Sequence, residues 1–171
     1  MLSNGAVKEF AIDAPSPPQL DRIPLTDAHR RGVVDPMTGS LLRVNGNGNP
    51  LVPEACNRTV PVFDGRMRFD LQFSYKRMGK VRATRGYQGP SVVCAVNFVP
   101  IAGYVPDRSA IKYLVKQRDM EVWLAPLAGT RVLVPFRIVI PTPLGTGILE
   151  AIQFVSVAQQ ARATPTSAKV D

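Results

Sequence analysis

Residues 63–76 alternate between apolar and polar side chains almost without a break. The odd positions, most of them apolar, hold Phe63, Gly65, Met67, Phe69, Leu71, Phe73 and Tyr75. Because successive side chains of a strand point to opposite faces, this pattern predicts a long strand with one apolar face. At about 3.3 Å per residue it would span roughly 45 Å, too long for a flat strand in a small domain. We therefore expect it to bend near Gly65, within a mainly β fold built on a curved antiparallel sheet or partly open barrel.

Further segments show the strand pattern and are separated by turn residues. They are residues 6–12, 80–85, 91–99, 120–124, 132–140 and 148–157. Met78-Gly79 is expected to turn the chain into the segment at 80–85, and Gly145-Thr146-Gly147 is expected to form a hairpin turn. Pro135 interrupts the segment at 132–140. Because proline cannot donate a ladder hydrogen bond, we expect an edge position or a bulge there.

Two short helices are predicted to accompany the sheet. Asp35 can cap the first helix, and Pro36 suits its first turn. The apolar residues of this helix would be Met37, Leu41, Leu42 and Val44. The second helix is predicted over residues 106–117, with Asp107 as its N-cap. Its apolar stripe, which we expect to pack on the sheet, consists of Ala110, Ile111, Leu114 and Val115.

The chain of 171 residues, 45% of them hydrophobic, can bury one core. We divide it into an N-terminal strand with an irregular Pro/Gly-rich arm (1–54), an antiparallel β domain (55–158) and a flexible tail (159–171), the arm and the β domain forming one domain. Asn4-Gly5 is a strong hairpin signal, yet only three residues precede it. We therefore expect the first strand of that hairpin to be missing and the chain to be a piece of a longer protein.

A net charge of +8 favours anionic partners. Between Tyr75 and Gly89 the chain carries five basic residues and no acid, namely Lys76, Arg77, Lys80, Arg82 and Arg85. This segment is either a surface for anionic ligands or a means of keeping a sheet edge from pairing. No recognised nucleic-acid motif accompanies the charge, which argues against nucleic acid as the partner. The apolar runs are also far shorter than the ~20 residues of a transmembrane helix, so no membrane span is predicted.

The sequence offers little for catalysis. His29, the single histidine, lies in the arm and is expected to be a solvated residue. The residues show no His, Cys and carboxylate cluster at metal-ligand spacing and no phosphate-binding loop, so we predict neither enzyme activity nor a metal or cofactor. Four acids are expected to be solvated or ion-paired on the surface, namely Asp64, Asp70, Asp119 and Glu121. Glu150 alternates with apolar residues and is expected to be half-buried, facing Arg66 or Arg68.

Cys56 and Cys94 are the only cysteines. An even pair suits one disulfide in an oxidising compartment, which we favour, but two buried thiols in the cytosol are also ordinary. The residues by themselves leave both alternatives open.

An ordered set of short motifs runs through most of the chain. These are DPMTG at 35–39, CNRT at 56–59, VFDGRMRFDL at 62–71, GYQG at 86–89, VC at 93–94, FVPIAGY at 98–104, MEVW at 120–123, PTPLG at 141–145 and EAIQF at 150–154. The set resembles a family of exported proteobacterial proteins known only as domain of unknown function 3108. The resemblance implies a signal peptide and N-terminal strands that this chain lacks, an oxidising periplasm, and a disulfide between Cys56 and Cys94. It also implies a curved sheet somewhat like that of lipoprotein carriers, and it brings no catalytic residues.

Two functions of different classes follow. The first is a non-enzymatic carrier that binds an apolar or lipid-like small molecule on a concave β surface; the alternative for that surface is an ordinary core filled by the second helix. The candidate ligand face consists of Phe63, Met67, Phe69, Leu71, Phe73, Phe98, Trp123, Phe136 and Phe154, with Val96 and Ile138 beside them. The second is an envelope protein that meets an anionic lipid or polymer through Lys76, Arg77, Lys80, Arg82 and Arg85. An open sheet edge would in addition allow a dimer.

Overall fold

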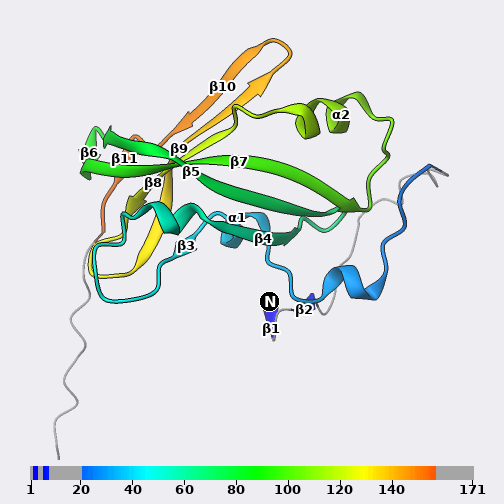
Figure 1. Cartoon of the computed structure of the whole chain (residues 1–171), viewed down its shortest axis with the longest axis horizontal. Helices are drawn as coiled ribbons and strands as arrows, with labels where there is room; N and C mark the ends of the chain where they lie inside the picture. Colours follow the sequence, from blue (N-terminus) through cyan, green and yellow to red (C-terminus); the bar gives the residue numbers. More distant parts are fainter. Residues whose placement is uncertain (1, 4–5, 8–20, 157–171) are drawn as a thin grey trace, which may run out of the picture.

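A computed structural model describes residues 2–3, 6–7 and 21–156, and it contains one large antiparallel sheet that curls into a half-barrel (Figure 1). Six of its seven strands follow the order β10-β9-β8-β7-β5-β4, and the seventh, the short β3, pairs with β9. The strands are β3 (Leu42–Arg43), β4 (Arg58–Phe63), β5 (Arg68–Arg82), β7 (Gln88–Ala102), β8 (Glu121–Pro126), β9 (Val132–Thr142) and β10 (Gly145–Glu150). The predicted fold class, a curved antiparallel sheet with short helices, is confirmed.

Two small strand pairs lie outside this sheet. Strand β1 (Leu2–Ser3) pairs with β2 (Ala6–Val7), so the first strand of the N-terminal hairpin, which we expected to be missing, is present. The remainder of the strand predicted at 6–12 and the tail at 159–171 lie outside the described residues. Strand β6 (Arg85–Gly86) pairs in parallel with β11 (Gln153–Phe154) at the far end of the β5–β7 hairpin.

The alternating segment 63–76 is two strands rather than one. Phe63 ends β4 and pairs with Arg68 at the start of β5, so the chain reverses between them. The Asp64 carboxylate accepts hydrogen bonds from the backbone N–H groups of Arg66 (2.8 Å) and Met67 (2.7 Å). Gly65 adopts a φ of 94°, a conformation that side-chain-bearing residues rarely take. The prediction of one bent strand was wrong because an Asp-Gly turn happened to continue the alternation.

The turn expected at Met78-Gly79 is also absent, because β5 continues for fifteen residues to Arg82. Its antiparallel partner β7 is equally long, so the return strand is residues 88–102 rather than 80–85. A bulge between Tyr75 and Arg77 shifts the register of this pair. Such a bulge adds one residue to one strand and so exchanges the faces to which later side chains point.

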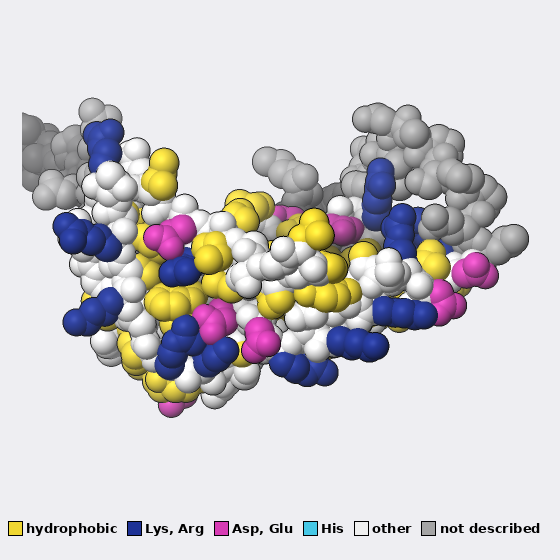
Figure 2. Space-filling model, turned by 90° about the horizontal axis from the view of Figure 1, so that it is seen from above, with side chains coloured by type: hydrophobic (Ala, Val, Ile, Leu, Met, Phe, Trp, Pro, Cys, Tyr) yellow, Lys and Arg dark blue, Asp and Glu magenta, His cyan; other side chains and the backbone are white. Residues whose placement is uncertain are grey.

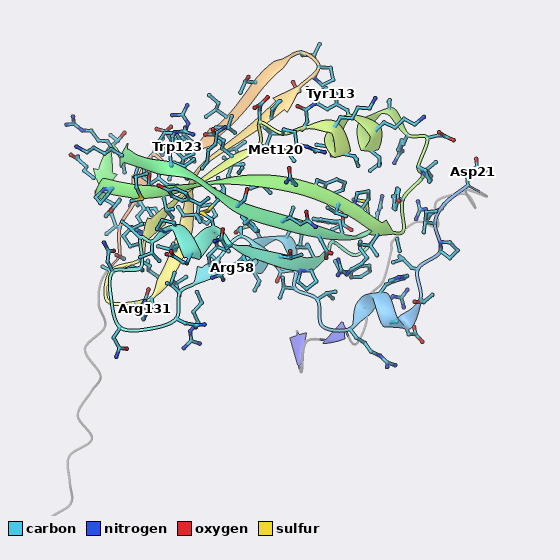
Figure 3. The ribbon with its side chains drawn as sticks, viewed as in Figure 1. Asp21, Arg58, Tyr113, Met120, Trp123 and Arg131 are labelled. Atoms are coloured by element: carbon cyan, nitrogen blue, oxygen red, sulfur yellow. A yellow bond between two sulfur atoms is a disulfide. The ribbon has the colours of Figure 1, made fainter. Side chains whose placement is uncertain are left out.

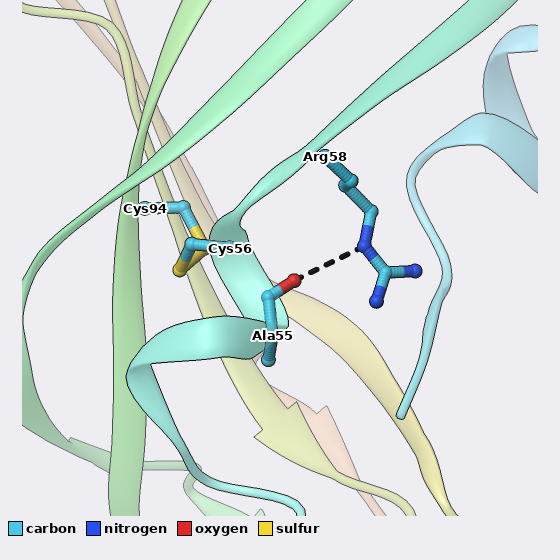
Figure 4. The surroundings of a disulfide bond; sticks show 4 residues. All are labelled: Ala55, Cys56, Arg58 and Cys94. Atoms are coloured by element: carbon cyan, nitrogen blue, oxygen red, sulfur yellow. Dashed lines mark hydrogen bonds between the residues drawn. A yellow bond between two sulfur atoms is a disulfide. The ribbon is translucent and has the colours of Figure 1, made fainter. Parts of the chain in front are cut away.

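The concave face of the sheet holds most of the core. Its largest buried cluster joins Phe73, Val92, Val122, Leu124 and Leu133 with the disulfide. Cys56 and Cys94 are completely buried and bonded, with Cα atoms 5.5 Å apart, which confirms the disulfide (Figure 4). Cys56 ends the 3-10 turn η2 (Pro53–Cys56), and Cys94 lies in the middle of β7. The bond therefore fixes the end of the arm to the centre of the sheet.

In the described part of the arm, two short helical segments precede β3. These are the 3-10 turn η1 (Asp27–Arg30) and α1 (Pro36–Gly39). Asp35 caps α1 as predicted, because its carboxylate accepts from the backbone N–H groups of Met37 and Thr38. The helix ends at Gly39 and does not reach Val44, since Leu42 pairs with Leu133 in the sheet and is fully buried.

The second helix, α2 (Ser109–Lys116), covers one end of the concave face (Figure 1). Asp107 does not cap it; Arg108 holds the N-cap position, and the Asp107 carboxylate forms an exposed ion pair with Lys112 at 2.7 Å. Ile111 and Leu114 pack against the cluster of Phe69 and Phe98. Ala110 and Val115, the other residues of the predicted stripe, are exposed. The helix thus covers one end of the face, the arm residues Leu42, Leu51 and Cys56 pack on its middle, and an apolar cleft stays open beside the helix.

The last hairpin also differs from the prediction. Thr142 pairs with Gly145, so residues 143–144 form the turn, and Gly145-Thr146-Gly147 belongs to β10. Pro135 lies in β9 at a register shift against β8, between the pairs of Trp123 and Leu124. Strand β10 pairs only with residues 137–142 and β3 only with residues 132–133, so Pro135 lies at a bulge on a stretch of β9 whose other side pairs with no described strand.

Candidate functional site

A cleft of about 210 Å³ lies on the concave face beside α2. Its exposed wall is entirely apolar. The side chains that form most of this wall are Leu71, Phe73, Val96, Phe98, Leu114, Met120, Val122 and Ile138. Met120 lies between the end of α2 and the start of β8, where Figure 3 labels it. The residues come from α2 and from four neighbouring strands, so the site exists only in the folded sheet.

Strand register explains how these residues meet. Leu71 pairs with Phe98 and Phe73 pairs with Val96, which places two apolar pairs side by side on β5 and β7. Val122 on β8 pairs with Ile138 on β9 and continues the same face. Because residues two apart on a strand share a face, each strand contributes one or two side chains to the wall. Leu114 of α2 closes one side.

The structure brings only part of the predicted ligand face to this cleft. Leu71, Phe73 and Phe98 line it, together with Val96 and Ile138. Phe69 lies on the same face of β5 beside the wall, with its ring centroid 5.1 Å from that of Phe98. Met67 packs against the cluster that contains Phe69 and Phe98, and Phe63 is buried at the end of β4.

Trp123, Phe136 and Phe154 lie elsewhere, in a cluster on the outer face of the sheet. Trp123 alternates with the inward-facing Val122 and Leu124 along β8, so it points away from the cleft. The ring centroids of Phe136 and Phe154 are 5.7 Å apart. Sequence reasoning placed these three with the cleft because it followed hydrophobicity, and could not see which face each strand turns to the helix.

A polar network on the outer face was not predicted. The Glu121 carboxylate accepts two hydrogen bonds from Arg77 (2.9 and 3.0 Å) and one from the Trp123 indole N–H (2.9 Å). Lys76 Nζ lies 2.8 Å from the same carboxylate, whose side chain is only 12% exposed. Hydrogen bonds from Arg77, and then from Lys76, lower the pKa of Glu121 to about 2, although burial opposes the shift.

The Trp123 ring is the centre of this network. The guanidinium carbons of Arg77 and Arg137 lie 5.0 and 5.3 Å from its centroid, within cation–π range. The ring also covers Gly79, where a Cβ atom would lie 2.7 Å from the indole. The one sequence signal for this network was Gly79, a glycine among basic residues that leaves room for the indole ring. We interpreted it as a turn residue, because the sequence does not show the bulge at Tyr75.

The five basic residues predicted to form one surface are divided by the fold. Lys76 and Arg77 are held by Glu121. Lys80 and Arg82 alternate with Val81, which packs in the outer-face cluster, so they point to the other side of the sheet. Within the described part of the chain, Lys80, Arg82 and Arg85 form no ion pair closer than 4.0 Å. Figure 2 shows Lys and Arg side chains spread among hydrophobic and acidic ones.

The remaining candidates have local roles. Glu150 is exposed and lies 3.5 Å from Arg137, so the expected half-buried pair with Arg66 or Arg68 is wrong. Arg68 instead binds Asp70 at 2.6 Å. The Nδ1 atom of His29 accepts a hydrogen bond from the backbone N–H of Thr26 at the start of η1.

Among residues 21–156 and the short N-terminal strands, no group of three His, Cys, Asp or Glu side chains is placed to hold a metal ion. The described helices are all too short or too polar to cross a membrane.

Residues 3–152 match a family described as "Protein of unknown function (DUF3108)". Neither a curated protein nor a solved structure shows a significant match to the chain.

Proposed function

The chain belongs to the DUF3108 family, whose function is unknown, and we propose that it is a non-enzymatic protein that binds a small apolar or lipid-like molecule in the cleft beside α2. The observation that carries this proposal is the uncovered apolar wall formed by four strands and the helix. Burying such a wall releases about 25 cal/mol for each Å² removed from water. An open apolar cleft of this kind is the usual form of a small-molecule site.

The size and chemistry of the cleft limit the ligand. Its volume of about 210 Å³ exceeds the roughly 150 Å³ of an engineered apolar cavity that binds benzene, so one ring or a short acyl chain fits. Two polar residues border the cleft, but neither offers it a free polar group. The Ser40 hydroxyl donates to the carbonyl of Met37, and Glu121 turns its carboxylate to the outer face, where Arg77 holds it. The site therefore selects a ligand by apolar contact, and any polar end of the ligand remains in water.

The test is an isothermal titration of the purified protein with toluene and, separately, with octanol. The Val96→Phe variant fills the cleft and should abolish the binding heat. The Val155→Phe variant adds the same side chain at an exposed position remote from the cleft and should bind normally. Equal binding by the two variants, with thermal unfolding showing both to be folded, would refute the cleft as the ligand site.

We further propose that the protein works in an oxidising compartment such as the periplasm. The support is the completely buried disulfide, since the cytosol keeps most protein thiols reduced. Alkylation of acid-quenched cells that produce the chain naturally should leave both cysteines unmodified until a reductant is added. Alkylation without reductant would contradict the assignment.

A second candidate function is contact with an anionic lipid or polymer through Lys80, Arg82 and Arg85. These side chains are exposed at the end of the β5–β7 hairpin and form no ion pair with any described residue. Lys80→Glu with Arg82→Glu should weaken sedimentation with phosphatidylglycerol vesicles and leave phosphatidylcholine vesicles unaffected. Arg108→Glu with Lys116→Glu is the control, because both residues are exposed at the two ends of α2 and the pair changes the net charge by the same amount. Equal loss in both variants would indicate a nonspecific effect of net charge.

A further inference from the structure

The two edges of the large sheet are treated differently. At the β4 edge, Val34 forms a parallel bridge with Val62, donating to the Pro61 carbonyl (3.0 Å) and accepting from the Phe63 N–H (2.9 Å). Pro61 itself lies in the edge strand and has no N–H to offer. At the other edge, no described residue pairs with the outer side of β10. One edge is thus protected and the other is open.

Strand β10 has few of the features that normally keep an edge from pairing. Its six residues, Gly145–Glu150, include no Lys, Arg or Pro, and its single charge is that of Glu150. Ile148 is 50% exposed and Leu149 is 64% exposed, and as neighbours they point to opposite faces. Figure 1 shows the β9–β10 hairpin extending away from the body of the sheet. The strand is therefore accessible along its edge and on both faces.

The hairpin register shows which backbone groups are free. Thr146 pairs with Pro141, which has no N–H, so this must be a non-hydrogen-bonded pair. In an antiparallel ladder such pairs alternate with hydrogen-bonded ones. The backbone N–H and C=O groups of Thr146, Ile148 and Glu150 therefore point away from β9, toward the open side.

We propose that β10 pairs with β10 of a second copy of this chain, antiparallel and symmetric about Ile148. The free backbone groups permit this register, since they place Ile148 opposite Ile148 and Thr146 opposite Glu150 in hydrogen-bonded pairs. On the other face Leu149 lies opposite Gly147, which has no side chain to obstruct it. A two-fold contact of this kind uses the same patch twice and closes at two copies. The covered β4 edge prevents further addition.

Charge favours a second copy at this place. The molecule carries a net charge of +8, so two copies repel each other over most of their surfaces. The β10 edge has no basic residue, and the only carboxylate in it lies 3.5 Å from Arg137 of its own chain. In the proposed register the two Glu150 residues are four positions apart along the strand, about 14 Å, and each faces a threonine. No like charges are brought together.

The dimer does not depend on a ligand in the cleft. The proposed contact nevertheless lies next to the cleft, because Leu149 pairs with Ile138, which lines the cleft on the concave face.

Sedimentation velocity of the full chain, from micromolar to near-millimolar concentration, tests the proposal. The wild-type chain should form a concentration-dependent dimer, and Leu149→Lys or Ile148→Lys should raise its dissociation constant at least roughly tenfold. Both residues are exposed, so the variants should fold. Ile152→Lys is the control, because Ile152 is 77% exposed but lies outside β10, and it should dimerise normally. A wild-type chain that remains a monomer throughout, or a dimer that tolerates both β10 variants, would overturn the proposal.

Cysteine crosslinking tests the register itself. The two native cysteines are bonded to each other, so an introduced cysteine would be the only free thiol. Facing residues in a hydrogen-bonded antiparallel pair have Cα atoms about 5.5 Å apart, within the roughly 4.4–6.8 Å that a disulfide spans. Ile148→Cys should therefore form a covalent dimer on mild oxidation, and Leu149→Cys should not. The reverse result, or no crosslink in a confirmed dimer, would exclude symmetry about Ile148.

Discussion

Alternate residues of strand β8 contribute to two faces of the sheet that are packed differently. Val122 and Leu124 point to the concave face, which contains the disulfide and the apolar cleft. Glu121 and Trp123 point to the outer face, where each is engaged by charged neighbours. The concave face leaves apolar volume uncovered, whereas the outer face leaves no room for even one methyl group at Gly79. One sheet can therefore be open to a ligand on one side and tightly packed on the other.

Removal of the disulfide should have the largest effect, and it tests what stabilises the concave face. On the chain-entropy model, Cys56→Ala with Cys94→Ala should lower the free energy of unfolding by about 4 kcal/mol, since the bond closes a loop of 38 residues. Urea unfolding measures the loss. The reduced wild-type chain should lose a similar amount, and the variant should not respond to reductant. A loss below about 1 kcal/mol would show that packing alone holds η2 to the sheet.

Neutralising Glu121 should have the next largest effect, because it leaves Arg77 and Lys76 without their carboxylate. Glu121→Gln should cost about 2 kcal/mol at neutral pH. The folded-state pKa of about 2 lies below the ordinary value of 4.5. This contribution is therefore complete above the unfolded pKa and is lost as pH falls from 4.5 toward 2.

Urea unfolding at several pH values should show a smaller loss of stability in this acid range for Glu121→Gln than for the wild-type chain. Glu150→Gln is the control, because that carboxylate is exposed and should change stability by less than about 0.5 kcal/mol. Identical acid profiles for the wild-type and Glu121→Gln proteins would contradict the assigned role of the network.

Gly79→Ala adds one methyl group to the closely packed outer face. The new Cβ would lie 2.7 Å from Trp123 and 3.0 Å from the Ser91 hydroxyl, so the indole must shift. We expect a loss of about 1–2 kcal/mol in thermal or urea unfolding, as for other overpacked sites. Gly48→Ala serves as the matched control, because nothing lies within 4 Å of its added Cβ. If the two variants are equally stable, the outer face is looser than the contacts indicate.

Val96→Phe should have the smallest effect on stability, although it adds far more volume than Gly79→Ala. Its ring enters the cleft, where there is space of about 210 Å³. We expect the free energy of unfolding to change by less than about 0.5 kcal/mol, because the new apolar contacts offset the lost rotamer freedom. If Val96→Phe lowers the free energy of unfolding more than Gly79→Ala does, the concave face has no more free space than the outer face, and the comparison fails.

Several elements were predictable because local physics decides them. The Asp35 cap depends on residues three positions apart, and the structure confirms it. The strands around Phe73, Val96 and Ile138 follow from simple alternation. The cleft was predicted in part for the same reason, since its residues on β5 and β7 share the inward face of their strands.

Other predictions failed where two physical signals competed. Asp64-Gly65 formed a turn inside an alternating pattern, and Met78-Gly79 did not turn because β7 pairs with β5 along its whole length. The network at Glu121 joins residues 44 positions apart, and no local pattern reports a contact of that kind.

The sequence by itself determined the mainly antiparallel β architecture, because the alternation of apolar and polar residues admits few other structures. It also supplied two cysteines at positions that a disulfide could join. Only the tertiary structure decided which residues share a face, since the bulges at Tyr75 and Pro135 exchange the faces of long strands. Only tertiary packing decided that α2 covers part of the concave face and leaves a cleft, because a helix of eight residues cannot bury a wall formed by four strands.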